Sequence, residues 1–237
     1  MSYANSVLGA RTNREGGPSA LAAAITGRVA AYGLHLDQNR RATLRVSVDC
    51  AVRTLSDFGA LGYWVGRAAH NRVPYFVGLE EACSDVALKA LGAAMAASGA
   101  VALYHVRGVT PEADQPDILV PDPEELVVDD LRPAYEALNC DAAGESVDLV
   151  WFGCPHAGID EITEVVRLLA GRRARAALWV TTARETRAEA ASSGLVSAIE
   201  ASGGRVLADM CVVVAPMQEL DFRTLATPSA KGATYVP

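Results

Sequence analysis

Two cysteines in the second half of the sequence stand where a chemical site is expected. Cys154 follows the apolar run Val147–Phe152, and Cys211 follows the run Arg205–Asp209. Because ligands of open parallel sheets bind beyond the carboxyl ends of the strands, both thiols are expected at one edge of a sheet. There they could bind a metal, and His156 could be a further ligand, could orient a thiolate, or could donate to a substrate oxygen. The alternative is that both cysteines only pack in the core, beside a capping histidine.

A second set of polar residues lies near the start of the chain. The segment Ser2–Ser19 is rich in Asn, Ser, Thr, Gly and Arg, which predicts a loop. It leads into a predicted helix that begins at Pro18 and ends near Gly27. Arginine binds carboxylates and phosphates through paired hydrogen bonds, and a helix N-terminus favours anions. We therefore expect a site for a small anionic substrate, and the alternative is a solvated surface loop. The candidate residues are Asn5, Ser6, Arg11, Thr12, Asn13 and Arg14.

The composition limits the class of protein. Of the 237 residues, 51% are hydrophobic and 21% are charged, which excludes a disordered chain. No apolar run reaches the roughly 18 residues that a membrane span needs, so no membrane partner is expected. A formal net charge of −7 argues against nucleic acid as a partner. The odd count of five cysteines indicates reduced thiols and predicts a cytoplasmic protein, in which Cys50, Cys83 and Cys140 are structural.

The elements that must position these residues divide into two groups. In the first group, Leu21, Ala22 and Ile25 are expected on one packed face of the Pro18–Gly27 helix. The remaining patterns predict strands at 43–50, 75–79 and 101–106 and helices at 56–70 and 85–98. They also predict a Pro- and Asp-rich connection at 114–125 and an acidic helix at 125–138.

From Val147 onward, apolar strands alternate with helices, which predicts a parallel sheet with covered faces. The strands are expected at 147–152, 176–181 and 205–209, and the helices at 159–169, 184–192 and 195–202. The fold class is therefore α/β, with parallel or mixed sheets covered by helices and two subdomains. The expected division is a loop-bearing subdomain at 1–113, a connection with an acidic helix at 114–146, and a doubly wound α/β subdomain at 147–237 that carries Cys154 and Cys211.

Several motifs of this sequence resemble the aconitase X family. The opening segment Tyr3–Pro18 resembles the family signature, and further matches occur along the whole chain. Taken together they are far more specific than a single glycine pattern, and they imply an aconitase-like fold. They cover nearly all of this chain but roughly the second half of a family large subunit. These further motifs are Tyr32–Leu36, Asp57–Gly62, Leu91–Ala94, His105–Ala113, Gly153–His156, Cys211–Pro216 and Thr227–Tyr235.

The resemblance implies an iron–sulfur hydro-lyase that removes water from a small hydroxy acid. Family substrates are cis-3-hydroxy-L-proline in bacterial members and phosphomevalonate in archaeal members, and the motif Arg14–Gly17 favours the hydroxyproline type. Cys154 and Cys211 match two of the three family cysteines that hold the cluster. The third lies upstream of the signature and is expected to be missing, which leaves the first subdomain incomplete. The small swivelling domain or subunit with the catalytic serine is also expected to be absent. The cofactor is expected to be an iron–sulfur cluster of 2Fe–2S or 4Fe–4S type, or mononuclear iron.

The resemblance also implies three catalytic candidates, His156, Ser229 and Lys231. His156 or Lys231 would assist proton transfer, while the principal base would belong to the small domain. Two departures from the family pattern are Pro228, where Asn is usual, and Gly158, where Ser is common. Two alternatives remain beside a dehydratase polypeptide. One is a non-catalytic fragment or subunit, and the other is a generic nucleotide-binding α/β domain, which the lack of a dinucleotide motif and of a P-loop disfavours.

Overall fold

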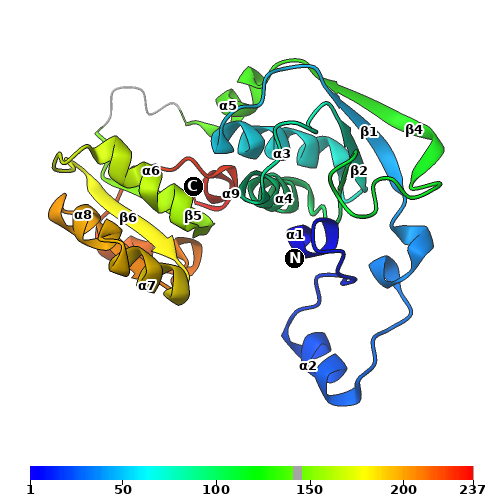
Figure 1. Cartoon of the computed structure of the whole chain (residues 1–237), viewed down its shortest axis with the longest axis horizontal. Coiled ribbons are helices and arrows are strands. Elements are labelled where there is room, and N and C mark those ends of the chain that lie inside the picture. Colours follow the sequence, from blue (N-terminus) through cyan, green and yellow to red (C-terminus); the bar gives the residue numbers. More distant parts are fainter. Residues whose placement is uncertain (141–145, 237) are drawn as a thin grey trace. The chain divides into compact units, whose positions relative to one another are not determined.

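The computed structural model describes residues 1–140 and 146–236, which form two compact units (Figure 1). The first unit spans Met1–Glu136 and the second spans Ala137–Pro237. Each unit contains its own four-stranded sheet, and all strand pairs in both sheets are parallel. This confirms the α/β class with two subdomains. Residues 141–145 of the expected 114–146 connection, and Pro237 of the expected second subdomain, lie outside the described residues.

The sheet of the first unit has the strand order β3-β2-β1-β4. Alternate residues of β1 are buried, as the apolar–polar alternation of this segment predicts. The strands are β1 (Ala42–Val48), β2 (Pro74–Val77), β3 (His105–Val106) and β4 (Leu119–Val128). The expected strand at 101–106 is therefore limited to its last two residues.

The strand β4 corrects the expectation of a connection and an acidic helix over 114–138. Residues Leu119–Val128 pair with β1 along the edge of the sheet, and the helix α5 is restricted to Arg132–Leu138. An edge strand tolerates proline because one side of its backbone needs no partner in the sheet. The acidic side chains of β4 stay exposed, and Glu124 and Glu125 form ion pairs with Arg72 and Arg45.

Two helices of the first unit, α3 (Leu55–Ala69) and α4 (Asp85–Gly99), pack against each other. Thr54 and Asp57 form a capping box at the start of α3, as residues of these types commonly do at a helix N-terminus. The two helices approach so closely that a Cβ atom on Gly62 would lie 2.5 Å from the Leu91 carbonyl oxygen. Glycine at this position therefore permits the contact that builds the core of this unit.

The opening segment differs from the expected loop. Ser2–Ser6 form a short helix, α1, which contacts α4, and Ser2, Asn5 and Ser6 are buried. The helix α2 (Gly17–Thr26) begins and ends as predicted, with Gly27 in the left-handed conformation. The expected packing of Leu21, Ala22 and Ile25 is wrong, because α2 has no buried residue in the described chain. Figure 1 shows why: α2 extends away from the sheet and helices that form the core of its unit. Two 3-10 turns, Gly33–His35 and Asp37–Asn39, lead from it to β1.

The sheet of the second unit has the strand order β7-β6-β5-β8. The three helices that the sequence predicts lie within one residue of their expected positions, whereas a fourth helix and the short strand β8 were not predicted. The strand β5 continues past the predicted end of its strand, through the cysteine motif. The strands are β5 (Leu149–Ala157), β6 (Ala177–Thr182), β7 (Arg205–Ala208) and β8 (Leu225–Ala226). The α-helices are α6 (Ile159–Leu169), α7 (Arg184–Ser192), α8 (Leu195–Ala201) and α9 (Ala230–Tyr235), with 3-10 turns at Val212–Val214 and Met217–Leu220.

Two buried clusters hold the second sheet. One contains Ile162 and Val165 of α6 and Ile199 of α8, packed on Val180 of β6. The other contains Leu149, Trp151 and Cys154 of β5 together with Val212. Apolar residues on both faces of the strands are expected for a parallel sheet that is covered on both sides. In the described parts of both units, no helix is long and apolar enough to cross a bilayer.

Candidate functional site

Cys154 and Cys211 of the second unit lie near each other, although they belong to β5 and to the segment after β7, two strands that are separated by β6. Cys154 is in the last part of β5 and is buried, whereas Cys211 follows β7 and is exposed. Burial raises the pKa of the Cys154 thiol, and the neighbouring Cys211 raises it further, while Lys231 and a hydrogen bond with Ser229 oppose the rise. The fold thus brings the two thiols, Ser229 and Lys231 to one place.

The backbone at Gly153 positions Cys154. Gly153 has a φ of 106°, and a Cβ atom on it would lie 2.0 Å from the Thr181 carbonyl oxygen. Only glycine fits this close approach of β5 to β6. The Thr181 hydroxyl accepts a hydrogen bond of 3.0 Å from Trp151 Nε1 and donates one of 2.9 Å to the Gly153 carbonyl oxygen. These contacts fix the chain immediately before the buried thiol.

Ser229 ties the C-terminal segment to the cysteine strand. Its hydroxyl caps α9 by accepting a hydrogen bond of 2.9 Å from the Gly232 amide, and it donates a hydrogen bond to the Cys154 carbonyl oxygen. The helix α9 approaches β5 closely, since a Cβ atom on Gly232 would lie 3.0 Å from the Trp151 ring. These contacts hold Lys231, in the first turn of α9, beside Cys154.

His156 connects the two cysteine segments. Its Nε2 atom lies 2.9 Å from the carbonyl oxygen of Met210, the residue before Cys211. Because a carbonyl oxygen only accepts hydrogen bonds, Nε2 carries the proton in this contact. His156 therefore fixes the segment that carries Cys211 relative to β5.

The fit of this site to a metal centre is incomplete. Two thiols that come together are suitable ligands for iron. However, among residues 1–140 and 146–236, no three His, Cys, Asp or Glu side chains are arranged to hold a metal ion. An iron–sulfur group at Cys154 and Cys211 would therefore need at least one ligand from outside the described residues.

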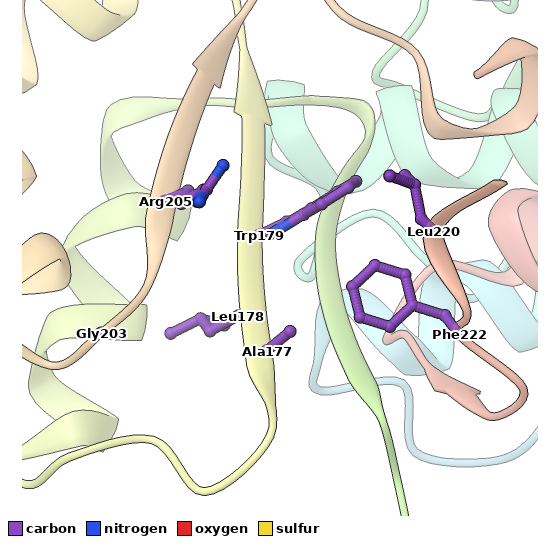
Figure 2. A pocket seen from close by; sticks show the side chains of 7 residues that line it. All are labelled: Ala177, Leu178, Trp179, Gly203, Arg205, Leu220 and Phe222. Atoms are coloured by element: carbon purple, nitrogen blue, oxygen red, sulfur yellow. The ribbon is translucent and has the colours of Figure 1, made fainter. Parts of the chain in front are cut away.

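A separate hollow of about 360 Å³ lies at the amino-terminal ends of β6 and β7 (Figure 2). Trp179 and Phe222 line it in an edge-to-face contact with ring centroids 5.5 Å apart, and Arg205 lies at its border. It is at the opposite end of the strands from Cys154 and Cys211, and none of the predicted site residues lines it.

In the first unit, five of the six anion-site candidates make internal contacts through their side chains, namely Asn5, Ser6, Arg11, Thr12 and Asn13. Asn5 is 1% exposed, and its side chain bonds the Thr12 amide and carbonyl groups and the Ala102 carbonyl oxygen. The buried Ser6 hydroxyl accepts a hydrogen bond from the Tyr104 amide. Asn13 accepts a hydrogen bond of 2.6 Å from the Leu34 amide. These contacts give the loop its shape, and the role of these side chains toward a substrate stays a prediction.

Glu15 and His35 add a hydrogen-bonded pair that the sequence reasoning missed. His35 Nε2 lies 2.6 Å from Glu15 Oε1, and the other carboxylate oxygen accepts a hydrogen bond from the Asn13 amide. Partial burial alone would raise the pKa of Glu15, but hydrogen bonds from His35, Thr12 and the backbone outweigh it and lower this pKa to about 2. The loop is therefore closed onto the turn before β1 by a charged carboxylate.

The two arginines of the loop differ. Arg11 Nη1 lies 2.5 Å from Asp37 and 3.2 Å from the His35 carbonyl oxygen, so its charge is partly neutralised. Arg14 is exposed and has a left-handed φ of 59°, and its amide donates to the Thr12 hydroxyl. No hydrogen bond or ion pair of the Arg14 guanidinium occurs among the described residues. Arg14 is thus the more available group for an anion.

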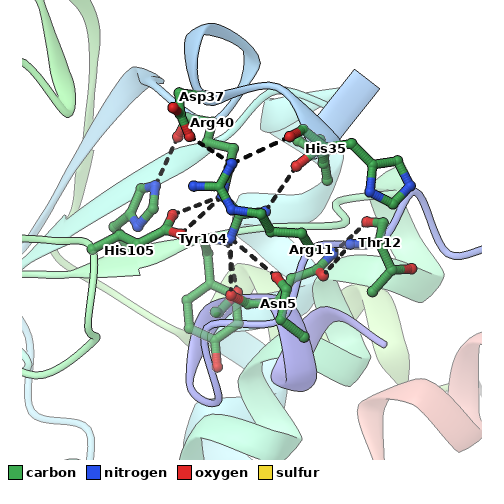
Figure 3. Close-up of polar contacts among 12 residues, drawn as sticks. Asn5, Arg11, Thr12, His35, Asp37, Arg40, Tyr104 and His105 are labelled. Carbon is green, nitrogen blue, oxygen red and sulfur yellow. Dashed lines mark hydrogen bonds and ion pairs between the residues drawn. The ribbon is translucent and has the colours of Figure 1, made fainter. Parts of the chain in front are cut away.

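A buried arginine that the sequence reasoning also missed lies beneath this loop (Figure 3). Arg40 is 1% exposed, and its Nε atom lies 2.8 Å and 2.9 Å from the two carboxylate oxygens of Glu112. Its Nη atoms donate to the carbonyl oxygens of Asn5, Ala10 and Leu34. No local signal distinguishes Arg40 from the adjacent Arg41, because its partners are far away in the sequence.

Comparisons with known proteins agree with this arrangement. Three family models match in order: Aconitase X first domain at residues 1–38, second domain at 42–136 and third domain at 147–237. The chain is 50% identical over 241 residues to the phosphomevalonate dehydratase large subunit of Methanothermobacter thermautotrophicus, covering 100% of this chain and 59% of that protein. It is 37% identical over 248 residues to the cis-3-hydroxy-L-proline dehydratase of Pseudomonas aeruginosa, covering 99% of this chain and 42% of that protein.

A solved structure of a related protein has a closely similar fold. The crystal structure of Thermococcus kodakaraensis aconitase X (holo-form) superposes with a TM-score of 0.90 at 44% sequence identity, covering 99% of this chain and 60% of that chain. The chain therefore spans less than two thirds of the length of these relatives. Since the three domain models together match almost all of the sequence, this chain belongs to the aconitase X family.

Proposed function

We propose that this chain is the part of a dehydratase that binds an iron–sulfur cofactor through Cys154 and Cys211 and a substrate anion through the Arg11–Arg14 loop. The observation that carries the proposal is the meeting of the two thiols, from different strands, beside Ser229 and Lys231. Support also comes from the two relatives named above, a phosphomevalonate dehydratase large subunit and a cis-3-hydroxy-L-proline dehydratase, since both are called dehydratases.

The proposed cofactor is an iron–sulfur cluster, of 2Fe–2S or 4Fe–4S type, or a single iron, completed by a ligand from outside the described residues. When bound, it would supply a Lewis acid for the leaving hydroxyl group of the substrate. Ser229 and His156 would keep the two cysteine segments in place through their bonds to the Cys154 and Met210 carbonyl oxygens. Lys231 would hold a proton next to the reacting group and assist its transfer.

The proposed substrate is a phosphorylated hydroxy acid of the phosphomevalonate type. The 50% identity to a phosphomevalonate dehydratase large subunit, against 37% to a hydroxyproline dehydratase, favours this substrate over the hydroxyproline type that the Arg14–Gly17 motif favours. The exposed guanidinium of Arg14 suits a phosphate or carboxylate, which it can bind through two parallel hydrogen bonds. The proposed partner is a small subunit or domain, because several relatives are named as large subunits.

A chimera tests this function. This chain replaces the matching 59% of the Methanothermobacter large subunit, and the product is purified without oxygen together with that enzyme's small subunit. Turnover of phosphomevalonate is expected, and turnover of cis-3-hydroxy-L-proline alone would instead favour the second substrate. A folded, iron-loaded chimera that converts neither compound would reject the dehydratase assignment, provided that the parent enzyme is active.

Cysteine variants of the same chimera test the ligand assignment. Cys154→Ser and Cys211→Ser are expected to lower the iron content and abolish turnover, whereas Cys83→Ser, in the first unit, serves as the matched control. Unchanged iron in the first two variants would contradict the proposed ligands.

A second candidate function is a non-catalytic subunit or fragment. It is favoured by the absence of a third metal ligand among the described residues and by the partial coverage of the relatives. Bound iron and sulfide in the purified 237-residue chain alone would count against it.

A further inference from the structure

The Arg11–Arg14 loop of the first unit, which is the proposed anion site, has little apolar packing of its own. Arg11, Arg14, Gly16 and Gly17 are exposed, and α2, which follows the loop, has no buried residue. A loop without buried apolar side chains must be fixed by polar contacts if it is to bind an anion in one geometry.

Arg40 makes the most deeply buried of these contacts. Its guanidinium donates to Leu34 at 3.1 Å and to Asn5 and Ala10 at 3.2 Å, and these three carbonyl oxygens lie on both sides of the Arg11–Arg14 segment. A guanidinium presents five N–H groups in a rigid plane and can therefore bind several carbonyl oxygens at once. Helix α1, the start of the loop and the 3-10 turn at Gly33–His35 thus converge on one side chain.

Glu112 keeps Arg40 in this orientation. Its carboxylate lies against Nε, so the two Nη atoms are directed to the loop. The Arg40 carbonyl oxygen is bound by Nε2 of the buried His105, which fixes the backbone as well. Burial lowers the pKa of His105, which favours the neutral ring beside the guanidinium.

We infer that Arg40 and Glu112 are positioning residues that hold the Arg11–Arg14 loop in its anion-binding shape, and do not themselves touch the anion. This inference rests on the proposed function of the loop. Four of the five N–H groups of Arg40 are directed to Glu112 and to the three carbonyl oxygens, and the residue is only 1% exposed, so it is not placed to meet an anion from solvent. Its effect on binding would pass through the backbone of the loop.

The double variant Arg40→Met/Glu112→Leu separates positioning from stability. Replacing a buried ion pair by apolar residues of similar size is often neutral for folding, whereas removing one partner leaves an unpaired buried charge. The double change keeps the net charge of the chain, so the long-range attraction of an anion is unchanged. The matched control is Arg45→Met/Glu125→Leu, which removes an exposed ion pair between β1 and β4 in the same unit.

Two measurements on the full chain decide the inference. The first is the affinity for inorganic phosphate by calorimetry, and the second is amide hydrogen exchange of residues 10–15. In the Arg40/Glu112 variant, phosphate is expected to bind about tenfold more weakly, the loss of about one charge-assisted hydrogen bond. Exchange of the loop amides should rise while the thermal midpoint stays near that of the wild type. The Arg45/Glu125 control should leave both quantities unchanged.

The outcomes distinguish this inference from the proposed function. If the wild type binds no phosphate, the anion site is wrong, and loop exchange alone then tests the positioning. If the wild type binds phosphate through Arg14, but the double variant changes neither the phosphate affinity nor the exchange of the loop amides, the positioning inference is overturned. Should the double variant fail to fold, Arg40→Lys decides, since lysine keeps the charge but cannot span three carbonyl oxygens. Wild-type affinity and exchange in that variant would also overturn the inference.

Discussion

Replacing Thr181 by valine is expected to destabilise the second unit more than the same change at the adjacent Thr182. Both residues are fully buried and the change conserves volume, so no cavity forms. Thr181→Val leaves the Trp151 indole N–H and the Gly153 carbonyl oxygen without their partner. At about 1–2 kcal/mol for each buried group left unsatisfied, the free energy of unfolding falls by about 3 kcal/mol. Thr182→Val affects only the Ala157 carbonyl oxygen and should cost about 1 kcal/mol.

The assay is urea unfolding followed by tryptophan fluorescence in a Trp64→Phe background. Trp64 is in the first unit, so the remaining tryptophans, Trp151 and Trp179, report on the second unit alone. A loss in Thr181→Val that is no larger than in Thr182→Val would refute the reasoning, because it would mean that the hydroxyl of Thr181 has no special role before Cys154. The comparison requires that the free energy of unfolding depends on urea concentration with the same slope in both variants.

Three further predictions concern other parts of the chain. Gly158→Ser supplies a hydroxyl acceptor at the start of α6, and a rise of about 0.5 kcal/mol in unfolding free energy is expected by urea titration; no rise would contradict this. The pKa of Glu15, lowered to about 2, means that the hydrogen bonds to its carboxylate stabilise the loop above the ordinary pKa of 4.5 and that this contribution is lost as the pH falls toward 2. A carboxyl carbon titration by NMR with a midpoint near 4.5 would contradict it. Iodoacetamide at pH 8 should label the exposed Cys211 well before the buried Cys154, whose pKa is raised; mass spectrometry of the peptides checks the order, and equal rates would be inconsistent with the burial.

The regular part of the fold could be predicted because its signals are local. In the second unit, apolar runs and helical periodicity identify β5, β6, α6 and α7 from a few neighbouring residues each. Parallel strands then require that residues following them share one edge of the sheet, so the sequence alone suffices to predict that Cys154 and Cys211 lie together. The family motifs could also be recognised from the sequence, because each of them is a string of adjacent residues.

Other features depended on partners far away in the chain. The strand β4 has proline and acidic residues that locally favour a connection or a helix, and only pairing with β1 makes it a strand. The apolar residues of α2 were expected to pack, but whether a helix face is covered depends on the rest of the fold.

For the candidate site, the same physical reason separates what the sequence determined from what only the tertiary structure decided. The sequence alone determined which residues could bind iron or an anion, since that depends on the chemistry of single side chains. Only the tertiary structure decided that Asn5 and Ser6 are buried in backbone contacts and that Arg40 meets Glu112, 72 positions away. Hydrogen bonds of this kind depend on where distant segments cross, and no local pattern of residues encodes that crossing.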